Sequence, residues 1–381
     1  MPEIDTSPLF TPFTLGTLTL PNRFVMPGMQ RQWCVDGKPI PKLVDYYRRR
    51  VLGGTPLVIT ESCAIDHSSA TQEMTYARMT DTTVEAWADC IDTIRQAGGQ
   101  MFLQLWHEGA VRREGGDGPD AHLPTLSPSG IRSQGRPQGR AATLEELAAI
   151  RDGFAHSALL AKQAGAAGVE VHACHGYLLD QFLWDVTNRR DDGYGGPDLA
   201  ARLRFPAEVV AAIRAAIGPD MIVSFRFSQW KQADYDAKIA RTPQELKLML
   251  DVIAAAGADM IHASTRRFFT PEWPGSPLGL AGWTKSLTHL PVIACGSVGL
   301  DTDVMDNFTA REAHQTGAAG ISELMTRFNN REFDLMSVGR ANIGDPDWVA
   351  KIRDGRYDEI LSFTRQDIMP VTRNKDGVRL S

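Results

Sequence analysis

Short apolar segments alternate with helical segments along most of this chain, and that alternation limits the folds open to it. The apolar segments predict strands at 24–26, 56–62, 100–106, 168–171, 221–227, 260–264, 291–295 and 333–338. Strands that alternate with helices indicate parallel βαβ units, and eight such units closing on themselves form a (β/α)8 TIM barrel. A doubly wound open sheet is the alternative, but no G-x-G-x-x-G follows the first strand.

The helical segments carry their own start and stop signals. We predict helices at 41–52, 84–97, 143–165, 199–217, 242–256, within 308–333 and at 345–354. Thr143 with Glu146 has the spacing of a capping box, and Pro243 after Thr242 suits a first helical turn. A β-hairpin is expected at 8–24 with its turn at Gly16, and a long polar loop at 108–142. We predict one domain, 1–381, with extended loops.

Composition excludes several classes of protein. A net charge of −6 argues against a nucleic-acid-binding surface. No apolar run approaches the roughly 20 residues of a membrane span, and the first ten residues lack the basic start and apolar core of a signal peptide. Five cysteines without a CxxC pair indicate reduced thiols in a cytoplasmic protein. We therefore expect a cytoplasmic protein that binds neither nucleic acid nor membrane, as a monomer or a homo-oligomer.

The segment 168–196 concentrates the chemistry of the chain. Its apolar strand runs into His172, His175 and Tyr177, and barrels place their working residues at this end of the strands. Two imidazole N–H groups can hold one carbonyl oxygen, and a nearby phenol can deliver a proton. Metal binding is the rival use of paired histidines. It would need further ligands at short spacing, such as HExxH, and none is present, although His107 and His262 could join such a site.

Other strand ends carry polar groups that a core must satisfy or a ligand must use. Gln104 and Arg226 lie on otherwise apolar strands, where a flat heterocycle with imide and carbonyl edges would give them partners. The alternatives are a core hydrogen bond for Gln104 and a salt bridge for Arg226. Gly296, Gly339 and Arg340 follow the last two strands, where barrels usually hold phosphate. The alternative is two turn glycines and a surface arginine.

Two further sets of residues are predicted to have structural rather than catalytic roles. Asn188–Arg190 with Asp191 and Asp192 is interpreted as a network that pins a loop. Cys63 and Cys174 lack an activating helix terminus, and Cys174 is expected to be small and buried.

The run from His172 to Gly196, HxxHGYLLDQFL followed by TNRRxDxYGG, resembles the signature of the old yellow enzyme family of FMN-dependent ene-reductases. The resemblance extends through NRFVMPGM, FLQLWHEG, RFS, VIACG and FDLMSVGRANIGDPDW. It implies one FMN across the barrel mouth and NADPH or NADH as reductant. The implied substrate is an α,β-unsaturated carbonyl or nitro compound, whose β-carbon receives a hydride from flavin N5. The chain resembles the single-domain branch, without an iron–sulfur centre, and no metal is expected.

The resemblance also implies roles for individual residues. Tyr177 would give the proton to the alkene, His172 and His175 would bind the substrate oxygen, and Trp106 would shape the pocket wall. The residues implied in binding the cofactor are Pro27, Met29, Ser62, Gln104, Arg226, Gly296, Gly339 and Arg340. The catalytic residues would be Tyr177, His172 and His175.

The sequence departs from the family pattern after the first strand. Gly28 stands where the family usually has proline, and Gln30 where a cysteine or threonine commonly tunes the flavin. The aromatic segment 266–280 is interpreted as a lid contributing Phe269 or Trp273. Two other functions stay open: a non-redox phosphate-substrate lyase using the same glycine–arginine site, and a flavin-binding protein without turnover.

Overall fold

The computed structural model describes residues 4–115, 118–303, 306 and 312–367. Eight parallel strands close into a barrel, because the first strand pairs with both the second and the last. In chain order they are β3 (Phe24–Met26), β6 (Leu57–Ala64), β8 (Gln100–Trp106), β13 (Gly168–His175), β14 (Ile222–Lys231), β15 (Met260–Ser264), β16 (Val292–Cys295) and β17 (Leu335–Ser337). The predicted (β/α)8 barrel is confirmed.

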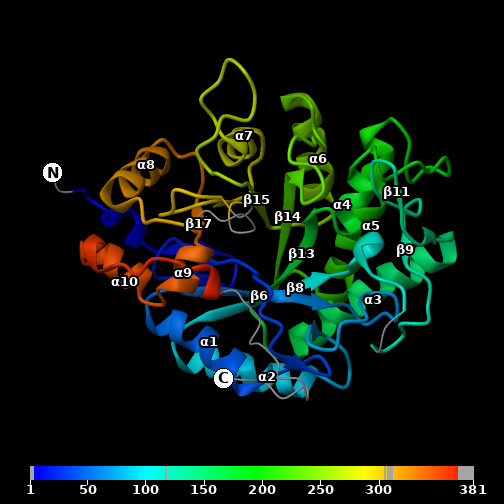
Figure 1. The fold of residues 1–381 in the computed structure, drawn as a ribbon, viewed down its shortest axis with the longest axis horizontal. Helices are drawn as coiled ribbons and strands as arrows, with labels where there is room; N and C mark the ends of the chain where they lie inside the picture. Colours follow the sequence, from blue (N-terminus) through cyan, green and yellow to red (C-terminus); the bar gives the residue numbers. More distant parts are fainter. Residues whose placement is uncertain (1–3, 116–117, 304–305, 307–311, 368–381) are drawn as a thin grey trace.

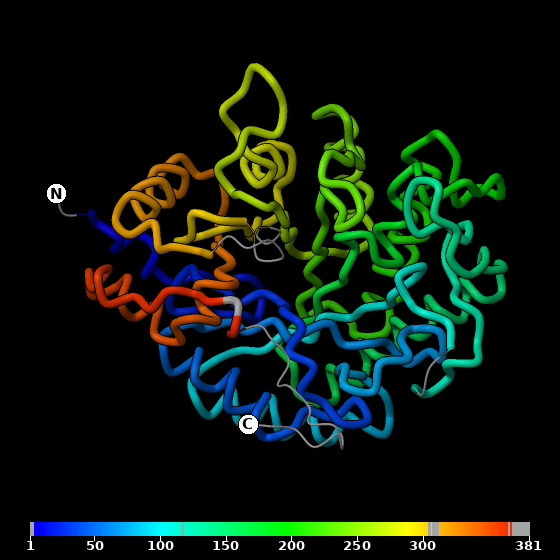
Figure 2. Tube along the Cα trace, viewed as in Figure 1, coloured from blue at the N-terminus to red at the C-terminus, as the bar shows by residue number. Residues whose placement is uncertain are grey.

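Helices surround the strands (Figure 1), and the chain passes around the barrel in sequence order (Figure 2). They are α1 (Pro41–Leu52), α2 (Val84–Gln96), α3 (Leu144–Gln163), α4 (Leu178–Leu183), α5 (Leu199–Ile217), α6 (Pro243–Ala255), α7 (Leu280–Leu287), α8 (Gly317–Asn329), α9 (Arg340–Gly344) and α10 (Trp348–Arg353). The Thr143 capping box is present, and Thr242 accepts a hydrogen bond from the backbone N–H of Glu245. None of the described helices is long and apolar enough to cross a membrane.

Several predicted boundaries of strands and of the hairpin were wrong. The central strand continues to His175 and the fifth strand to Lys231. His172 and His175, expected just beyond the central strand, therefore lie on it. The hairpin is confined to β1 (Phe13–Leu15) and β2 (Leu18–Leu20), since Ser7–Phe10 forms a 3-10 turn. Of the helical region predicted within 308–333, residues 308–311 lie outside the described residues.

The predicted polar loop at 108–142 contains short strands that one sequence could not reveal. They form two small pairs, β9 (Leu126–Ser127) with β12 (Arg140–Ala141) and β10 (Ile131–Ser133) with β11 (Arg136–Pro137). Two-residue strands are too short to show the alternating pattern that marks a strand.

Inside the barrel, an apolar layer lies below a polar one. Hairpin residues Leu18 and Leu20 pack in one cluster with Phe102, Ile222 and Met260 from the barrel strands. Two residues further along these strands come Gln104, Ser224 and His262, and alternate residues of a strand face the same side. The hairpin therefore fills the amino end of the barrel, and polar side chains gather toward its carboxyl end.

Candidate active site

His172 lies near the end of β13, with its side chain buried in the barrel mouth. Its Nδ1 is 3.3 Å from the Ser62 hydroxyl, and Gln104 Oε1 lies 2.9 Å from the same hydroxyl oxygen. The hydroxyl has one hydrogen, so it can donate either to Gln104 or to His172. Burial and the positive charge of Arg226 lower the pKa of His172 to about 3, so the imidazole is neutral at ordinary pH. To donate from Nε2, the ring must carry its proton there and accept the Ser62 hydrogen at Nδ1, in place of Gln104 Oε1. The direction in which the Ser62 hydroxyl donates thus decides which nitrogen of His172 carries the proton.

His175 differs from His172 in its surroundings. It has a positive φ of 64°, and its backbone N–H donates to Ser228 Oγ at 3.0 Å. Its Nε2 is 2.9 Å from Ser264 Oγ, and its ring packs against Trp230 with centroids 4.6 Å apart. Burial and the charge of Arg226 lower the pKa of His175 well below its ordinary value. Because Nε2 is engaged by Ser264, only Nδ1 remains to contact a ligand.

Tyr177 is the N-cap residue of α4, and its ring lies between two other aromatic side chains. The centroids of Trp106 and His172 are each 5.1 Å from that of Tyr177, in edge-on arrangements. Burial raises the pKa of Tyr177 to about 12. The phenol therefore keeps its proton at any pH at which the protein is handled, as a proton donor must.

Glu170 is the centre of the polar layer beneath these residues. Its carboxylate accepts from Gln104 Nε2 at 2.8 Å, lies 2.7 Å from His262 Nδ1, and accepts from Ser224 Oγ at 3.3 Å. Burial alone would raise the pKa of Glu170, but His262 and Arg226 outweigh it and lower the pKa to about 2. The carboxylate is thus ionised, and it fixes the orientation of the Gln104 amide.

Arg226 connects this layer to the histidines. Its Nη2 donates to Ser264 Oγ at 3.3 Å, and its Nη1 lies 3.9 Å from Glu170 Oε1. The core hydrogen bond considered for Gln104 and the salt bridge considered for Arg226 are therefore both present. The salt bridge does not satisfy every donor of Arg226, because its buried Nε has no partner within the described chain.

The segment after β3 approaches the same mouth. An added Cβ at Gly28 would lie 2.5 Å from the Thr60 carbonyl oxygen and 2.7 Å from Gln104 Nε2, so this position has no room for a side chain. A Cβ at Gly339 would lie 3.3 Å from Met29 Sδ and 3.5 Å from Pro27 Cγ. The structure thus brings Pro27 and Met29 next to one of the glycines predicted to hold phosphate.

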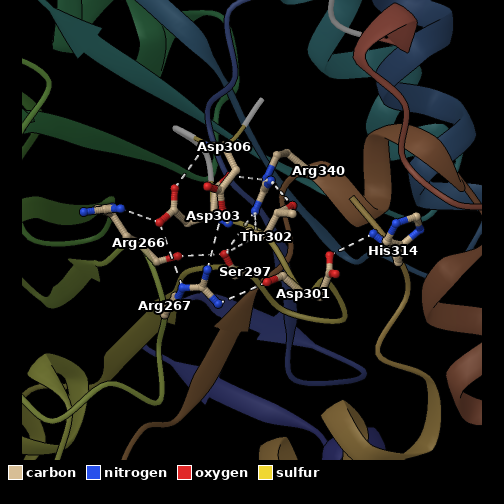
Figure 3. A network of polar contacts seen from close by, with 9 residues as sticks. All are labelled: Arg266, Arg267, Ser297, Asp301, Thr302, Asp303, Asp306, His314 and Arg340. Atoms are coloured by element: carbon tan, nitrogen blue, oxygen red, sulfur yellow. Dashed lines mark hydrogen bonds and ion pairs between the residues drawn. The ribbon is translucent and has the colours of Figure 1, made fainter. Parts of the chain in front are cut away.

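The glycine–arginine cluster lies at the ends of the neighbouring strands β16 and β17. Gly296 has a φ of 140°, and a Cβ there would lie 2.6 Å from the Thr265 carbonyl oxygen. Arg340 donates to the Ser297 hydroxyl at 3.0 Å and to the Asp303 carbonyl at 2.8 Å (Figure 3). Burial lowers the pKa of Arg340 to about 10, although Asp303 opposes the shift. The arginine is therefore packed against the loop after β16 and is not a free surface group.

Buried polar atoms without a hydrogen-bond partner gather at the carboxyl end of the barrel. Within the part of the chain that the structure describes, they include Gln30 Nε2, Trp106 Nε1, His172 Nε2, Arg226 Nε, His262 Nε2 and Ser337 Oγ. An unsatisfied buried polar group costs roughly 1–3 kcal/mol. Several such atoms at one mouth fit a bound polar ligand that supplies the missing partners.

The rival interpretations can be checked against the same geometry. Ligand atoms of His172, Cys174 and His175 lie within 4.8 Å of one another, but burial raises the pKa of the Cys174 thiol well above its ordinary value. His107 is engaged elsewhere, with Nε2 2.9 Å from Ser69 Oγ, and His262 is held by Glu170. A thiol that keeps its proton is a poor metal ligand.

The NRRDDGYGG run is a structural network. Asn188 Nδ2 donates to the carbonyls of Phe182 and Tyr194, and Arg190 binds Asp192 and the carbonyls of Pro128 and Ala142. The interpretation that these residues pin a loop is supported.

The lid expected from segment 266–280 is not built from its aromatic side chains. Phe269 packs on Phe268, with centroids 5.3 Å apart, and Trp273 packs on Trp283 at the same distance. Trp273 Nε1 also donates to the Arg241 carbonyl at 2.9 Å. These contacts hold both rings against the body of the protein.

Sequence reasoning missed Glu170 and the ion pair of Lys231 with Asp180. Lys231 Nζ is 2.7 Å from Asp180 Oδ1 with both side chains fully buried, and Asp180 also accepts from the Gly176 N–H. A signal for Glu170 was available, because a carboxylate inside an apolar strand needs a buried partner. No comparable signal joins Lys231 to Asp180 across the intervening helices.

Comparison with known proteins identifies the class to which this fold and site belong. The family model described as the NADH:flavin oxidoreductase / NADH oxidase family matches residues 8–321. The chain belongs to this family, and the resemblance to old yellow enzymes is confirmed. This family consists of flavin-dependent oxidoreductases.

Particular relatives sharpen this assignment. An NADH oxidase of Thermoanaerobacter brockii is 31% identical over 92% of this chain and 52% of its own length. The 12-oxophytodienoate reductase 7 of Oryza sativa subsp. japonica is 33% identical over 91% of this chain and 88% of its own. The solved structure of morphinone reductase is 26% identical with a TM-score of 0.75, covering 93% and 90% of the two chains. The chain spans about half the length of the NADH oxidase and of a metal reductase that it also matches.

Proposed function

We propose that this protein is an FMN-dependent ene-reductase that uses NADH or NADPH to reduce the activated C=C bond of α,β-unsaturated carbonyl or nitro compounds. The observation that carries the proposal is the pairing of two neutral imidazoles with a protonated phenol above a layer of buried, partly unsatisfied polar groups. Relatives named as 12-oxophytodienoate and morphinone reductases support it. We also propose that residues 1–381 act as one domain.

The residues at the mouth fit FMN. Gln104 and Arg226 would meet the polar edge of its ring system, and Pro27, Met29 and Ser62 would line the ring. Gly296, Gly339 and Arg340 would hold the phosphate. When bound, FMN would supply hydride chemistry that no side chain can.

The side chains themselves would do three things. His172 Nε2 and His175 Nδ1 donate to the carbonyl or nitro oxygen and draw electron density from the alkene, so its β-carbon becomes electrophilic. Tyr177 gives its proton to the α-carbon. Trp106 holds the Tyr177 ring in place and closes the pocket wall. Neutral imidazoles suit this role because they donate without changing the net charge of the site.

The test begins with the purified protein. We expect it to be yellow, to bleach anaerobically with NADH or NADPH, and to regain colour with 2-cyclohexen-1-one. A colourless protein would favour the phosphate-substrate lyase. A yellow protein that neither bleaches nor reoxidises would favour a flavin-binding protein without turnover.

A further inference from the structure

A cavity of about 310 Å³ lies next to the histidine site, and the two share a wall. Trp230 lines the cavity and also packs on His175. Its indole N–H donates to the Ser264 carbonyl at 3.3 Å, which fixes the ring. A ligand whose reactive end contacts His175 can therefore continue over Trp230 into this cavity.

Aromatic side chains continue from that wall to a positive charge. The Tyr235 ring centroid is 6.4 Å from that of Trp230, and the guanidinium of Arg266 lies 4.6 Å above the Tyr235 ring. Flat aromatic surfaces favour a planar heterocycle, and a guanidinium favours a phosphate. The order of these groups thus matches a nucleobase carried beside a phosphate.

The lining of the cavity carries one more cation than carboxylates. Its cations are Lys238, Arg266 and Arg267, and its carboxylates are Glu272 and Asp303. Arg266 Nη2 is 2.5 Å from Asp303 Oδ2, and Arg267 Nε lies 3.9 Å from the same oxygen (Figure 3).

The cations make further contacts, among them a hydrogen bond from Arg267 Nη1 to the Asp301 carbonyl at 3.1 Å. Lys238 pairs with Glu272, and Arg267 reaches Asp306 outside the lining at 3.5 Å. Arg266 Nε is buried and has no partner among the described residues. One donor of Arg266 is thus unsatisfied until a ligand arrives.

We propose that this cavity binds the phosphorylated adenosine half of the nicotinamide coenzyme, with Arg266 on a phosphate and Tyr235 against the base. The proposal rests on the proposed function, which needs a nicotinamide dinucleotide whose other end reaches His175. In this proposal the arginines of segment 266–280 contribute to binding the coenzyme.

Calorimetric titration of the purified protein tests the site without turnover. Adenosine 2′,5′-bisphosphate and adenosine 5′-monophosphate are titrated into the wild type and Arg266→Gln, with adenosine as the uncharged reference. We expect the affinity for at least one of the two phosphates to fall roughly tenfold or more, because a charge-assisted hydrogen bond is lost. The affinity for adenosine is expected to be unchanged in Arg266→Gln and to fall in Tyr235→Ala.

The matched control is Arg204→Gln. Arg204 also lies over a tyrosine ring, at 4.5 Å from Tyr194, and also pairs with a carboxylate, Glu208, but it lies outside the cavity lining. It should leave every affinity unchanged. Circular dichroism melting establishes that the variants are folded, and Tyr235→Ala removes a side chain that is already 38% exposed.

Stopped-flow reduction of the flavin then separates binding from chemistry. For Arg266→Gln we expect a higher dissociation constant for the coenzyme, with the limiting rate of reduction and reoxidation by cyclohexenone unchanged. Equal phosphate affinity in the wild type and Arg266→Gln would overturn the proposal. If the protein is not reduced by NADH or NADPH, the proposed function fails, while the nucleotide titration still decides whether the cavity binds a phosphorylated adenosine.

Discussion

Glu170 Oε2 lies 2.7 Å from His262 Nδ1, and neither side chain is exposed to solvent. The two residues come from β13 and β15, on either side of β14. Burial alone would lower the pKa of His262, but the Glu170 carboxylate raises it above its ordinary value. A buried charge without a partner is costly, so each residue stabilises the other.

Replacing Glu170 with Gln should destabilise the protein by roughly 3–5 kcal/mol, because it leaves His262 and Arg226 without their shared counter-charge. Urea unfolding followed by circular dichroism measures the loss. Glu208→Gln is the matched control, since its partner Arg204 is 55% exposed, and it should cost less than about 1 kcal/mol. A similar cost for both variants would show that the buried pair contributes no more than a surface one.

The same pair predicts how stability depends on pH. The pKa of His262 is raised in the folded protein, so its contribution is complete below the unfolded value of 6.5 and is lost as pH rises through the folded value. The pKa of Glu170 is lowered to about 2, so its contribution is complete above 4.5 and is lost as pH falls through 2. The difference in unfolding free energy between the wild type and Glu170→Gln should therefore be largest between about pH 4.5 and 6.5. A difference that does not vary with pH would contradict the charge assignment.

Tyr177→Phe should slow reoxidation of the reduced protein by cyclohexenone roughly 10²–10⁴-fold, the usual contribution of a positioned proton donor. Reduction by NADH or NADPH should be nearly unchanged, because that step needs no proton from the phenol. Stopped-flow absorbance at the flavin band measures both steps. Tyr194→Phe, whose hydroxyl donates to Glu208 at 2.9 Å, is the control and should affect neither. Equal losses in both steps for Tyr177→Phe would remove the proton-donor role.

His172→Ala should weaken phenol binding roughly tenfold or more, because a phenolate mimics the substrate oxygen and loses one donor. Ser62→Ala should weaken it less, since the Ser62 hydroxyl acts on the phenol only through the position of the His172 proton. Spectral titration with phenol gives both dissociation constants. His156→Ala on the exposed face of α3 serves as the control. Unchanged phenol affinity in His172→Ala would refute its role in oxygen binding.

Lys231→Met should lower the free energy of unfolding by roughly 3–5 kcal/mol, because it leaves the Asp180 carboxylate buried without its cation. The double variant Lys231→Met/Asp180→Asn should recover part of this loss, since no unpaired charge remains and the Asn side chain can still accept from the Gly176 N–H. Urea unfolding distinguishes the two. A double variant less stable than Lys231→Met would contradict this explanation.

Local signals in the sequence were enough for much of the fold. The capping box of Thr143 and Glu146 lies within one helical turn, and the periodic apolar strands carry their own pattern. The positions of His172, His175 and Tyr177 at one barrel mouth follow from the fold class, because parallel strands end on the same side. These features depend on neighbours in the chain, and one sequence contains them.

The rest depends on contacts between distant strands. In β6 an irregularity between Ile59 and Ser62 sets Ser62 opposite Gln104. Ile59 pairs with Phe102, so an unbroken register would have put Glu61 opposite Gln104. Glu61 instead accepts from the backbone N–H of Arg31. Glu170 and His262 are 92 residues apart, and no local pattern pairs them. Bulges and long-range ion pairs arise from packing, which is why they had to be seen in three dimensions.

The hairpin β1–β2 has a kinetic consequence. Its leucines fill the amino end of the barrel with hydrocarbon. In the proposed reaction, reductant and oxidant would therefore both enter through the carboxyl end. Because both would occupy the same position above the polar layer, only one of them can bind at a time. Double-reciprocal plots of initial rate should accordingly give parallel lines, and each partner in excess should compete with the other.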